Sequence, residues 1–388
     1  MESPISPTDA SRQAWLDVAR LLAMFLMVCC HCADPFNFYN GHDAALLAEI
    51  QFWGGAWGSL IRPCIPLFVM ITGSLLLPLQ RETGPFLRRY LPRVVWPFII
   101  WSVVYYLFPW LLSLMGGGRD ELALFFPYAA DEPLTFGAAL VRIAHIPFNF
   151  NPLAVQMWYI YLLIGLYLYL PVFSAWVERA SLRAKLWFLG AWAVTLLLPY
   201  YRQFADGQLW GECSWNGFGL LYYFCGFNGY LLLGHVLRRH VLPMRTVLVW
   251  GVPMFIVGYL ITLFGFNYTR EVSNATGDWD ILELFWTYCS LNVALMSAPL
   301  FAILRHVRVR SVRLQALLRN QSACGFGIFM MHYFLVGPAV ELMRLLGIPT
   351  GVQIPLAAVV AFPVAWLVVE ALRRLLGPRA SLVVLGAR

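Results

Sequence analysis

Two side chains that can do chemistry, Arg20 and His31, lie in one apolar stretch near the start of the chain, residues 16–33. They are eleven positions apart, which is about three turns of an α-helix, so both fall on one helix face roughly 16 Å apart along the axis. A guanidinium binds anions through paired N–H groups, and a neutral imidazole takes up a proton near pH 7. Ionisable residues inside an apolar helix are candidates for function. The alternative is that Arg20 extends to the nearer membrane interface and His31 is a buried structural group.

The composition places this helix in a membrane. Of the 388 residues, 60% are hydrophobic and 12% are charged, against roughly 25% charged in soluble proteins. We therefore expect an all-α, polytopic integral membrane protein. Stretches long enough to cross a bilayer, at about 20 residues each, occur ten times, at 15–33, 60–79, 94–115, 153–175, 186–203, 216–237, 246–266, 284–304, 322–343 and 352–372.

The charges between these stretches give an orientation. Most of the arginines fall in one set of alternate connections and most of the acids in the other, which is the bias expected between the cytoplasmic and outer sides. This segregation predicts ten transmembrane helices with both termini cytoplasmic: an N-terminal segment 1–14, a single membrane domain 15–372 and a C-terminal tail 373–388. The net charge of +7 follows from the same bias, so we expect no nucleic-acid partner.

Two further sets of residues suit chemistry. Arg88, Arg89 and Arg93 precede the third stretch and suit a large anion such as a nucleotide-bearing donor, although an ordinary cytoplasmic loop also explains them. His332 lies about ten residues inside its own stretch and either serves a reaction or bonds a neighbouring helix.

A metal site is not expected. Cys29, Cys30 and Cys32 flank His31, but consecutive helical positions point around most of the helix circumference and cannot converge on one ion. We interpret these cysteines as small buried residues.

Six landmarks in this order resemble the membrane-bound acyltransferase family 3, over about residues 13–372. They are the Arg20-x10-His31 spacing, the run Pro66-Leu-Phe-Val-Met-Ile-Thr-Gly73, the arginines before the third stretch, Trp158-Tyr159-Ile-Tyr161, Gly229-Tyr230-Leu-Leu-Leu-Gly234 and Phe326-Gly-Ile-Phe-x-x-His332. The chain most resembles the branch that O-acetylates surface polysaccharides and lipid-linked glycans, which implies a bacterial cytoplasmic (inner) membrane.

The resemblance implies an acyl-CoA donor on the cytoplasmic side, most often acetyl-CoA, and a glycan acceptor facing outward, with no tightly bound cofactor. Arg88, Arg89 and Arg93 would hold the donor phosphates. Arg20 would hold the pyrophosphate or pantetheine region, with Asp17 one turn earlier fixing its guanidinium. His31 would act as general base on the acceptor hydroxyl, or would carry the acyl group itself. The possible acceptor residues are His332, Trp158, Tyr159 and Tyr230.

The chain departs from the family pattern at two places. The family commonly has Arg-x-x-Arg before the third stretch, whereas Arg88 and Arg89 are five and four positions before Arg93. Some members have a histidine just before the tryptophan of the fourth stretch, where Gln156 and Met157 stand here.

Two other functions remain open from the sequence. Ten stretches with intramembrane charges, prolines and glycines also describe a secondary transporter or polysaccharide exporter, although such carriers often show an internal repeat that this chain lacks. A non-catalytic membrane subunit of a glycan assembly complex is the third possibility.

Overall fold

The computed structural model describes residues 10–37, 44–205 and 208–387, and these residues form helices joined by turns, with no β-strand among them. Seven helices in this part of the chain are long and apolar enough to cross a membrane, and one sharply bent pair brings the number to eight. The prediction of an all-α, polytopic membrane protein is confirmed.

Two of the stretches expected to be transmembrane helices, 216–237 and 284–304, do not form a single long helix in the structure. The first consists of a 3₁₀ turn, Gly219–Phe224, and a 12-residue helix, α10 (Asn228–Arg239), separated by Gly226 at φ +83°. The second contains the 14-residue helix α13 (Leu291–Leu304). At 1.5 Å per residue both are shorter than the ~30 Å hydrocarbon core of a bilayer.

The chain divides into two compact units, each built from three separate stretches. Unit 1 comprises Met1–Leu26, Ser59–Pro78 and Ser174–Ser322, and unit 2 comprises Met27–Gly58, Leu79–Phe173 and Ala323–Arg388. Four helices contribute residues to both units: α1 (Ala10–Asn37), α2 (Ala44–Leu60), α7 (Trp158–Arg179) and α14 (Val312–Met331).

Unit 1 also contains α3 (Cys64–Leu76), α8 (Leu182–Thr195), α9 (Leu198–Phe204), α10, α12 (Val252–Thr276) and α13. Its most extensive helix contact joins α3 and α10. A Cβ added to Gly73 would lie 2.0 Å from the carbonyl oxygen of Leu231, and one added to Gly234 would lie 2.0 Å from that of Met70. Glycines of two sequence landmarks therefore serve close backbone packing between these helices.

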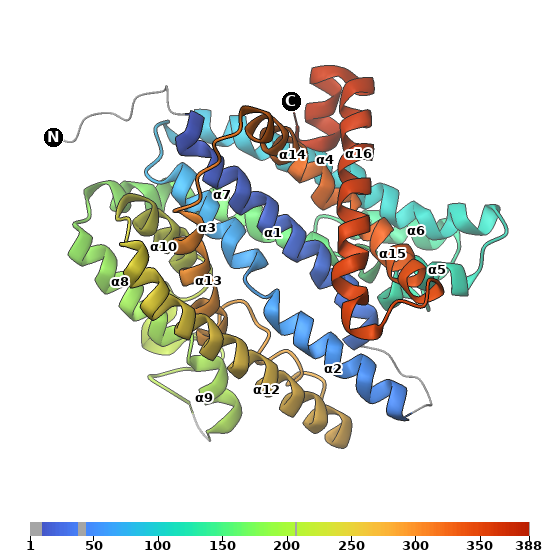
Figure 1. Cartoon of the computed structure of the whole chain (residues 1–388), viewed down its shortest axis with the longest axis horizontal. Helices are drawn as coiled ribbons and strands as arrows, with labels where there is room; N and C mark the ends of the chain where they lie inside the picture. The colour runs from blue at the N-terminus through green and yellow to red at the C-terminus, as the bar shows by residue number, and fades with distance from the viewer. Residues whose placement is uncertain (1–9, 38–43, 206–207, 388) are drawn as a thin grey trace. The chain divides into compact units, whose positions relative to one another are not determined.

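Unit 2 also contains α4 (Thr83–Leu114), α5 (Arg119–Phe125), α6 (Phe136–His145), α15 (Tyr333–Leu345) and α16 (Thr350–Leu385). Helix α15 lies between α16 and the short α5 (Figure 1). The contact with α5 is again close, because a Cβ on Gly337 would meet the Leu124 carbonyl oxygen at 1.8 Å. The long connection 116–152 is thus folded onto the helices of its own unit.

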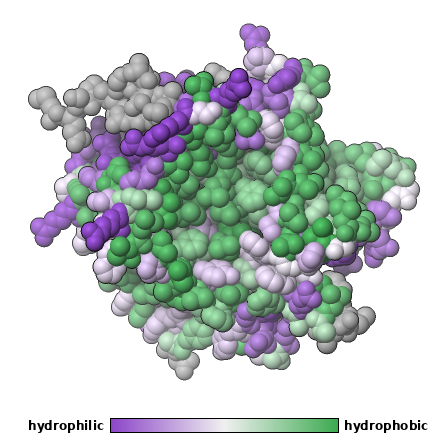
Figure 2. Space-filling view, in the orientation of Figure 1, coloured by the Kyte–Doolittle hydropathy of each residue, from purple (hydrophilic) through white to green (hydrophobic). Residues whose placement is uncertain are grey.

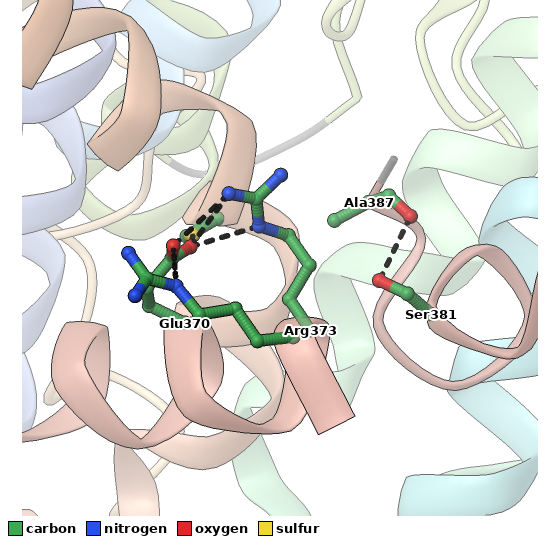
Figure 3. A network of polar contacts seen from close by, with 6 residues as sticks. Glu370, Arg373, Ser381 and Ala387 are labelled. Atoms are coloured by element: carbon green, nitrogen blue, oxygen red, sulfur yellow. Dashed lines mark hydrogen bonds and ion pairs between the residues drawn. The ribbon is translucent and has the colours of Figure 1, made fainter. Parts of the chain in front are cut away.

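The segment expected to be a cytoplasmic tail, 373–388, continues α16 as far as Leu385. The helix bends at Gly377 (φ +69°), and the residues after the bend fold back, so that Trp101 Nε1 donates to the Val384 carbonyl at 3.0 Å. Before the bend, the buried Glu370 accepts bonds from Arg373 and Arg374 at 2.7–3.1 Å (Figure 3). Paired arginines satisfy a carboxylate that would otherwise be costly to bury.

The outer faces of the long helices suit contact with lipid. Large apolar side chains such as Phe264 on α12 and Val359 and Leu367 on α16 are exposed. Figure 2 shows a face dominated by hydrophobic residues. Continuous exposed apolar surface of this extent is typical of a membrane protein.

Candidate active site

Helix α1 carries both candidate residues identified first from the sequence, Arg20 and His31. Its apolar run is helical from Ala10 to Asn37, although Pro35 lies inside it. Proline has no N–H, so Pro35 cannot donate the usual helical hydrogen bond to the carbonyl four residues earlier. The last turn is held by Asn37, whose Nδ2 donates to the Ala33 carbonyl at 3.0 Å.

His31 forms a dyad with a carboxylate of its own helix. Its Nδ1 lies 2.8 Å from Oδ2 of Asp34, one turn later, and both side chains are largely buried but not closed off. An ionised carboxylate only accepts hydrogen bonds, so Nδ1 carries the hydrogen, and Nε2 of a neutral imidazole keeps its lone pair. Asp34 therefore sets the tautomer that a general base needs.

His332 forms a corner in the chain. It joins α14 to α15, and the two helix axes differ by 82° there. The imidazole bonds the end of α14, with Nδ1 2.8 Å from the carbonyl oxygen of Phe329. A carbonyl also only accepts, so Nδ1 of His332 carries the hydrogen and Nε2 is an acceptor. This Nε2 is fully buried, and no described residue bonds it.

The two imidazoles, from opposite ends of the sequence, come together in unit 2. The ring centroids of His31 and His332 are 5.3 Å apart. The ring of Tyr333 meets His31 edge-on at 5.1 Å. Its hydroxyl is buried and also makes no hydrogen bond within the described chain. Phe126 stacks on Tyr333 at 5.7 Å and Phe329 lies 5.9 Å from His332, so aromatic rings surround the polar atoms.

The connection after α5 brings Tyr128 to the same place. Burial first, and then the negative charge of Asp34, raise the pKa of Tyr128 well above its usual value. The phenol therefore stays protonated and is able to donate a hydrogen bond toward the carboxylate. This connection is fixed by the buried Arg142, which bonds Glu132 Oε2 at 2.8 Å.

Arg20 belongs to unit 1. Its Nη1 lies 3.4 Å from Oδ1 of Asp17 and 3.1 Å from the hydroxyl oxygen of Ser322. The contact expected between Asp17 and the guanidinium is present. About a third of the Arg20 side chain, 37%, remains exposed, so the group is oriented and still accessible.

The three arginines expected to hold the donor lie on α4. Arg88 and Arg89 are exposed and Arg93 is half-buried. Arg89 and Arg93 both lie over the ring of Tyr90, each with its guanidinium carbon 6.0 Å from the ring centroid. The irregular spacing thus still places two guanidinium groups about a common aromatic side chain.

The three aromatic residues expected to contact the acceptor belong to different units: Trp158 and Tyr159 to unit 2, and Tyr230 to unit 1. Trp158 begins α7 and Tyr159 follows it, with its ring 5.7 Å from that of Phe329 in unit 2. Tyr230 belongs to unit 1, is fully buried, and donates to the Tyr288 carbonyl at 2.7 Å. The contacts of Tyr230 are those of a structural residue.

Three residues around His31, namely Asp34, Tyr128 and Tyr333, were not identified from the sequence. Asp34 had a signal, because residues three apart on a helix are neighbours, but its charge also fits the acidic bias of the outer connections. Tyr333 had none, since only the corner at His332 directs its ring toward α1.

Because the Tyr333 hydroxyl has no hydrogen-bond partner among the described residues, removing it should affect stability less than removing the hydroxyl of Tyr105. Tyr105 donates to the Met330 carbonyl at 2.7 Å, so Tyr105→Phe should lower the free energy of unfolding by about 1–2 kcal/mol, whereas Tyr333→Phe should change it by less than about 0.5 kcal/mol. Thermal unfolding of the purified variants measures both. Equal destabilisation would mean that the Tyr333 hydroxyl has a protein partner.

Comparison with protein families identifies the family of the chain. The family described as an acyltransferase domain, acyltransferase family 3, matches residues 13–370, nearly the whole chain and every candidate residue above. The chain belongs to acyltransferase family 3. Comparison with curated proteins and with solved structures gave no match. As a member of this family with seven to eight apolar helices of spanning length among its described residues, the protein is a multi-pass membrane acyltransferase.

Proposed function

We propose that the protein transfers an acyl group, in the first instance acetyl, from cytoplasmic acyl-CoA to a hydroxyl of an extracytoplasmic or lipid-linked glycan. The observation that supports this proposal is the dyad of His31 and Asp34, in which the contact at 2.8 Å directs the ring hydrogen to Nδ1 and makes Nε2 the basic nitrogen of the neutral ring. Acyl transfer to an alcohol needs such a base, because a neutral hydroxyl is a poor nucleophile.

In the proposed step, the acceptor hydroxyl gives its proton to Nε2 of His31 while its oxygen attacks the thioester carbon. The bond from that carbon to sulfur breaks, and the departing CoA thiolate takes the proton back from His31. Asp34 stabilises the imidazolium that exists between these two events.

The arginines are the proposed binding groups for the acyl-CoA donor. Coenzyme A carries several phosphate charges, which guanidinium groups bind bidentately. Along α1, Arg20 lies roughly 16 Å to the cytoplasmic side of His31 in the proposed orientation, and the flexible pantetheine arm is suited to extend along such a helix. Arg88, Arg89 and Arg93 are the proposed contacts of the nucleotide end.

The acceptor proposal depends on the aromatic surroundings of His31. Sugar rings bind proteins through C–H faces on aromatic side chains and through hydroxyls on polar atoms. The rings of Phe126, Tyr159 and Phe329 pack around Tyr333 and His332 in unit 2, and they are the proposed aromatic side of the acceptor site. With the orientation from the charge bias, the acceptor end lies toward the outer leaflet of a bacterial cytoplasmic membrane.

The test is transfer of label from radioactive acetyl-CoA to glycan in membranes, without an ion gradient. Arg20→Ala should raise the KM for acetyl-CoA roughly tenfold or more, because a charge-assisted contact with phosphate is lost. Arg313→Ala, which removes an exposed arginine of the same unit, should leave KM unchanged.

Two outcomes would contradict the proposal. If well-folded wild-type protein transfers no label to glycan, acyl transfer to glycan is ruled out. Movement of a glycan across vesicles, dependent on a gradient and without acyl transfer, would favour the transporter instead.

A further inference from the structure

Two buried polar atoms beside the dyad have no partner in the part of the chain that the structure describes: Nε2 of His332 and the hydroxyl oxygen of Tyr333. Both side chains are almost fully enclosed, at 0% and 1% exposed. Burying a polar group without a hydrogen bond is unfavourable, and native proteins rarely leave such a group unexplained. Two of them next to a candidate base indicate a place where a ligand supplies the missing bonds.

We propose that these two atoms bind a second hydroxyl of the acceptor, on the carbon next to the hydroxyl that is acylated. The acceptor is then a vicinal diol, and His332 and Tyr333 are positioning residues that select it. This inference depends on the proposed function, because it assigns the acceptor of that same reaction.

The hydrogen-bonding capacities of the two atoms fit an alcohol. Nε2 of His332 only accepts, since the hydrogen of that ring is on Nδ1, directed at the Phe329 carbonyl. The Tyr333 hydroxyl can donate. One alcohol group can donate to the first and accept from the second at once, whereas a carbonyl, ether or carboxylate oxygen leaves Nε2 unsatisfied.

The proximity of the two rings is compatible with a second hydroxyl close to the first. Both imidazoles keep Nε2 as acceptor, and their centroids are 5.3 Å apart. Oxygens on neighbouring carbons are separated by about the length of a hydrogen bond, so the two hydroxyls of a diol can each donate to one of the two imidazoles. The edge-on contact of Tyr333 with His31 at 5.1 Å places the phenol in the same neighbourhood.

The two histidines differ in the partner of Nδ1, and this difference separates their roles. His31 faces the Asp34 carboxylate, which stabilises a positive charge on that ring. His332 faces only backbone carbonyls, and a second imidazolium beside the first would be repelled. His31 is therefore the base, and His332 orients the substrate as a neutral acceptor.

The experiment compares two small alcohols that differ by one neighbouring hydroxyl, trans-cyclohexane-1,2-diol and cyclohexanol. Acetylation of each by purified full-length protein and radioactive acetyl-CoA gives a ratio of kcat/KM values. Wild type should favour the diol by roughly tenfold or more, because a site built to bond a hydroxyl discriminates against an analogue without it.

The variants assign that preference to the two atoms. His332→Asn can keep a donor toward the backbone but places no acceptor at the position of Nε2, so the ratio should fall to about two, the value given by the number of hydroxyls. His332→Gln extends a carbonyl toward the position of Nε2 and should recover part of the preference. Tyr333→Phe should lower the ratio severalfold, while Tyr105→Phe, whose hydroxyl already has a partner, should leave it unchanged.

Each outcome is decisive. A wild-type ratio near two, or no reaction with either probe while acylation of membrane glycan still depends on His31, overturns the diol site and leaves the proposed function standing. A preference that survives in both His332→Asn and Tyr333→Phe overturns the assignment, and water is then the occupant. Failure of every acyl transfer by folded wild-type protein is a failure of the proposed function instead.

Discussion

His31→Gln is expected to lower acyl transfer by a factor of about 10²–10⁴, the usual contribution of a general base. Glutamine is similar in length but takes up no proton at neutral pH. The loss should appear in kcat, with the KM for acetyl-CoA nearly unchanged, because the donor contacts proposed for Arg20 and the α4 arginines remain. The measurement is steady-state transfer to glycan at matched protein levels.

A matched control for His31 is available in the same unit. His145 is exposed, and its Nδ1 lies 2.7 Å from the Val141 carbonyl oxygen, so His145→Gln removes an imidazole from a similar helical setting without touching the dyad. Its activity should equal that of wild type. Activity of His31→Gln within about threefold of wild type would exclude general-base catalysis by His31 at the magnitude expected here.

Asp34→Asn is expected to produce the second largest loss, again roughly 10²–10⁴ in kcat. An asparagine amide can donate to Nδ1 of His31, and the ring hydrogen then moves to Nε2, where it blocks proton uptake. The side chain keeps its size, so the variant should insert and unfold much as wild type does. Kinetics with acetyl-CoA and a thermal unfolding curve measure the two properties separately.

The control for Asp34 is Asp131→Asn, which neutralises an exposed acid of the connection 116–152. It should retain full activity. If Asp34→Asn also retains activity while His31→Gln does not, the carboxylate has no part in setting the tautomer, and the role assigned to the bond at 2.8 Å is wrong.

Much of the architecture could be predicted from composition and periodicity alone. The apolar helix over residues 16–33, which puts Arg20 and His31 on one element, depends on local sequence. The family match confirms the resemblance drawn from the six landmarks. The contact of Asp17 with Arg20 followed from the same helical spacing.

Other features depend on contacts between distant segments and had no local signal. The 82° corner at His332 lies in a run whose hydropathy resembles that of a straight helix. Residues 216–237 are apolar enough to span, but a 3₁₀ turn and a left-handed glycine divide them. The burial of Ser381 and Leu385 after the bend at Gly377 requires the partners that they meet in unit 2, which hydropathy does not describe.

The hydrogens on the two Nδ1 atoms have a consequence for energy coupling. Asp34 holds one and the carbonyl of Phe329 holds the other, so the resting pair of imidazoles offers two lone pairs and no proton on the reacting side. In the proposed reaction the proton arrives with the alcohol and leaves with the thiol. The protein then begins and ends each turnover with the same proton inventory and draws none from either side of the membrane. Turnover of this kind depends on the free energy of the thioester alone and is indifferent to the proton-motive force.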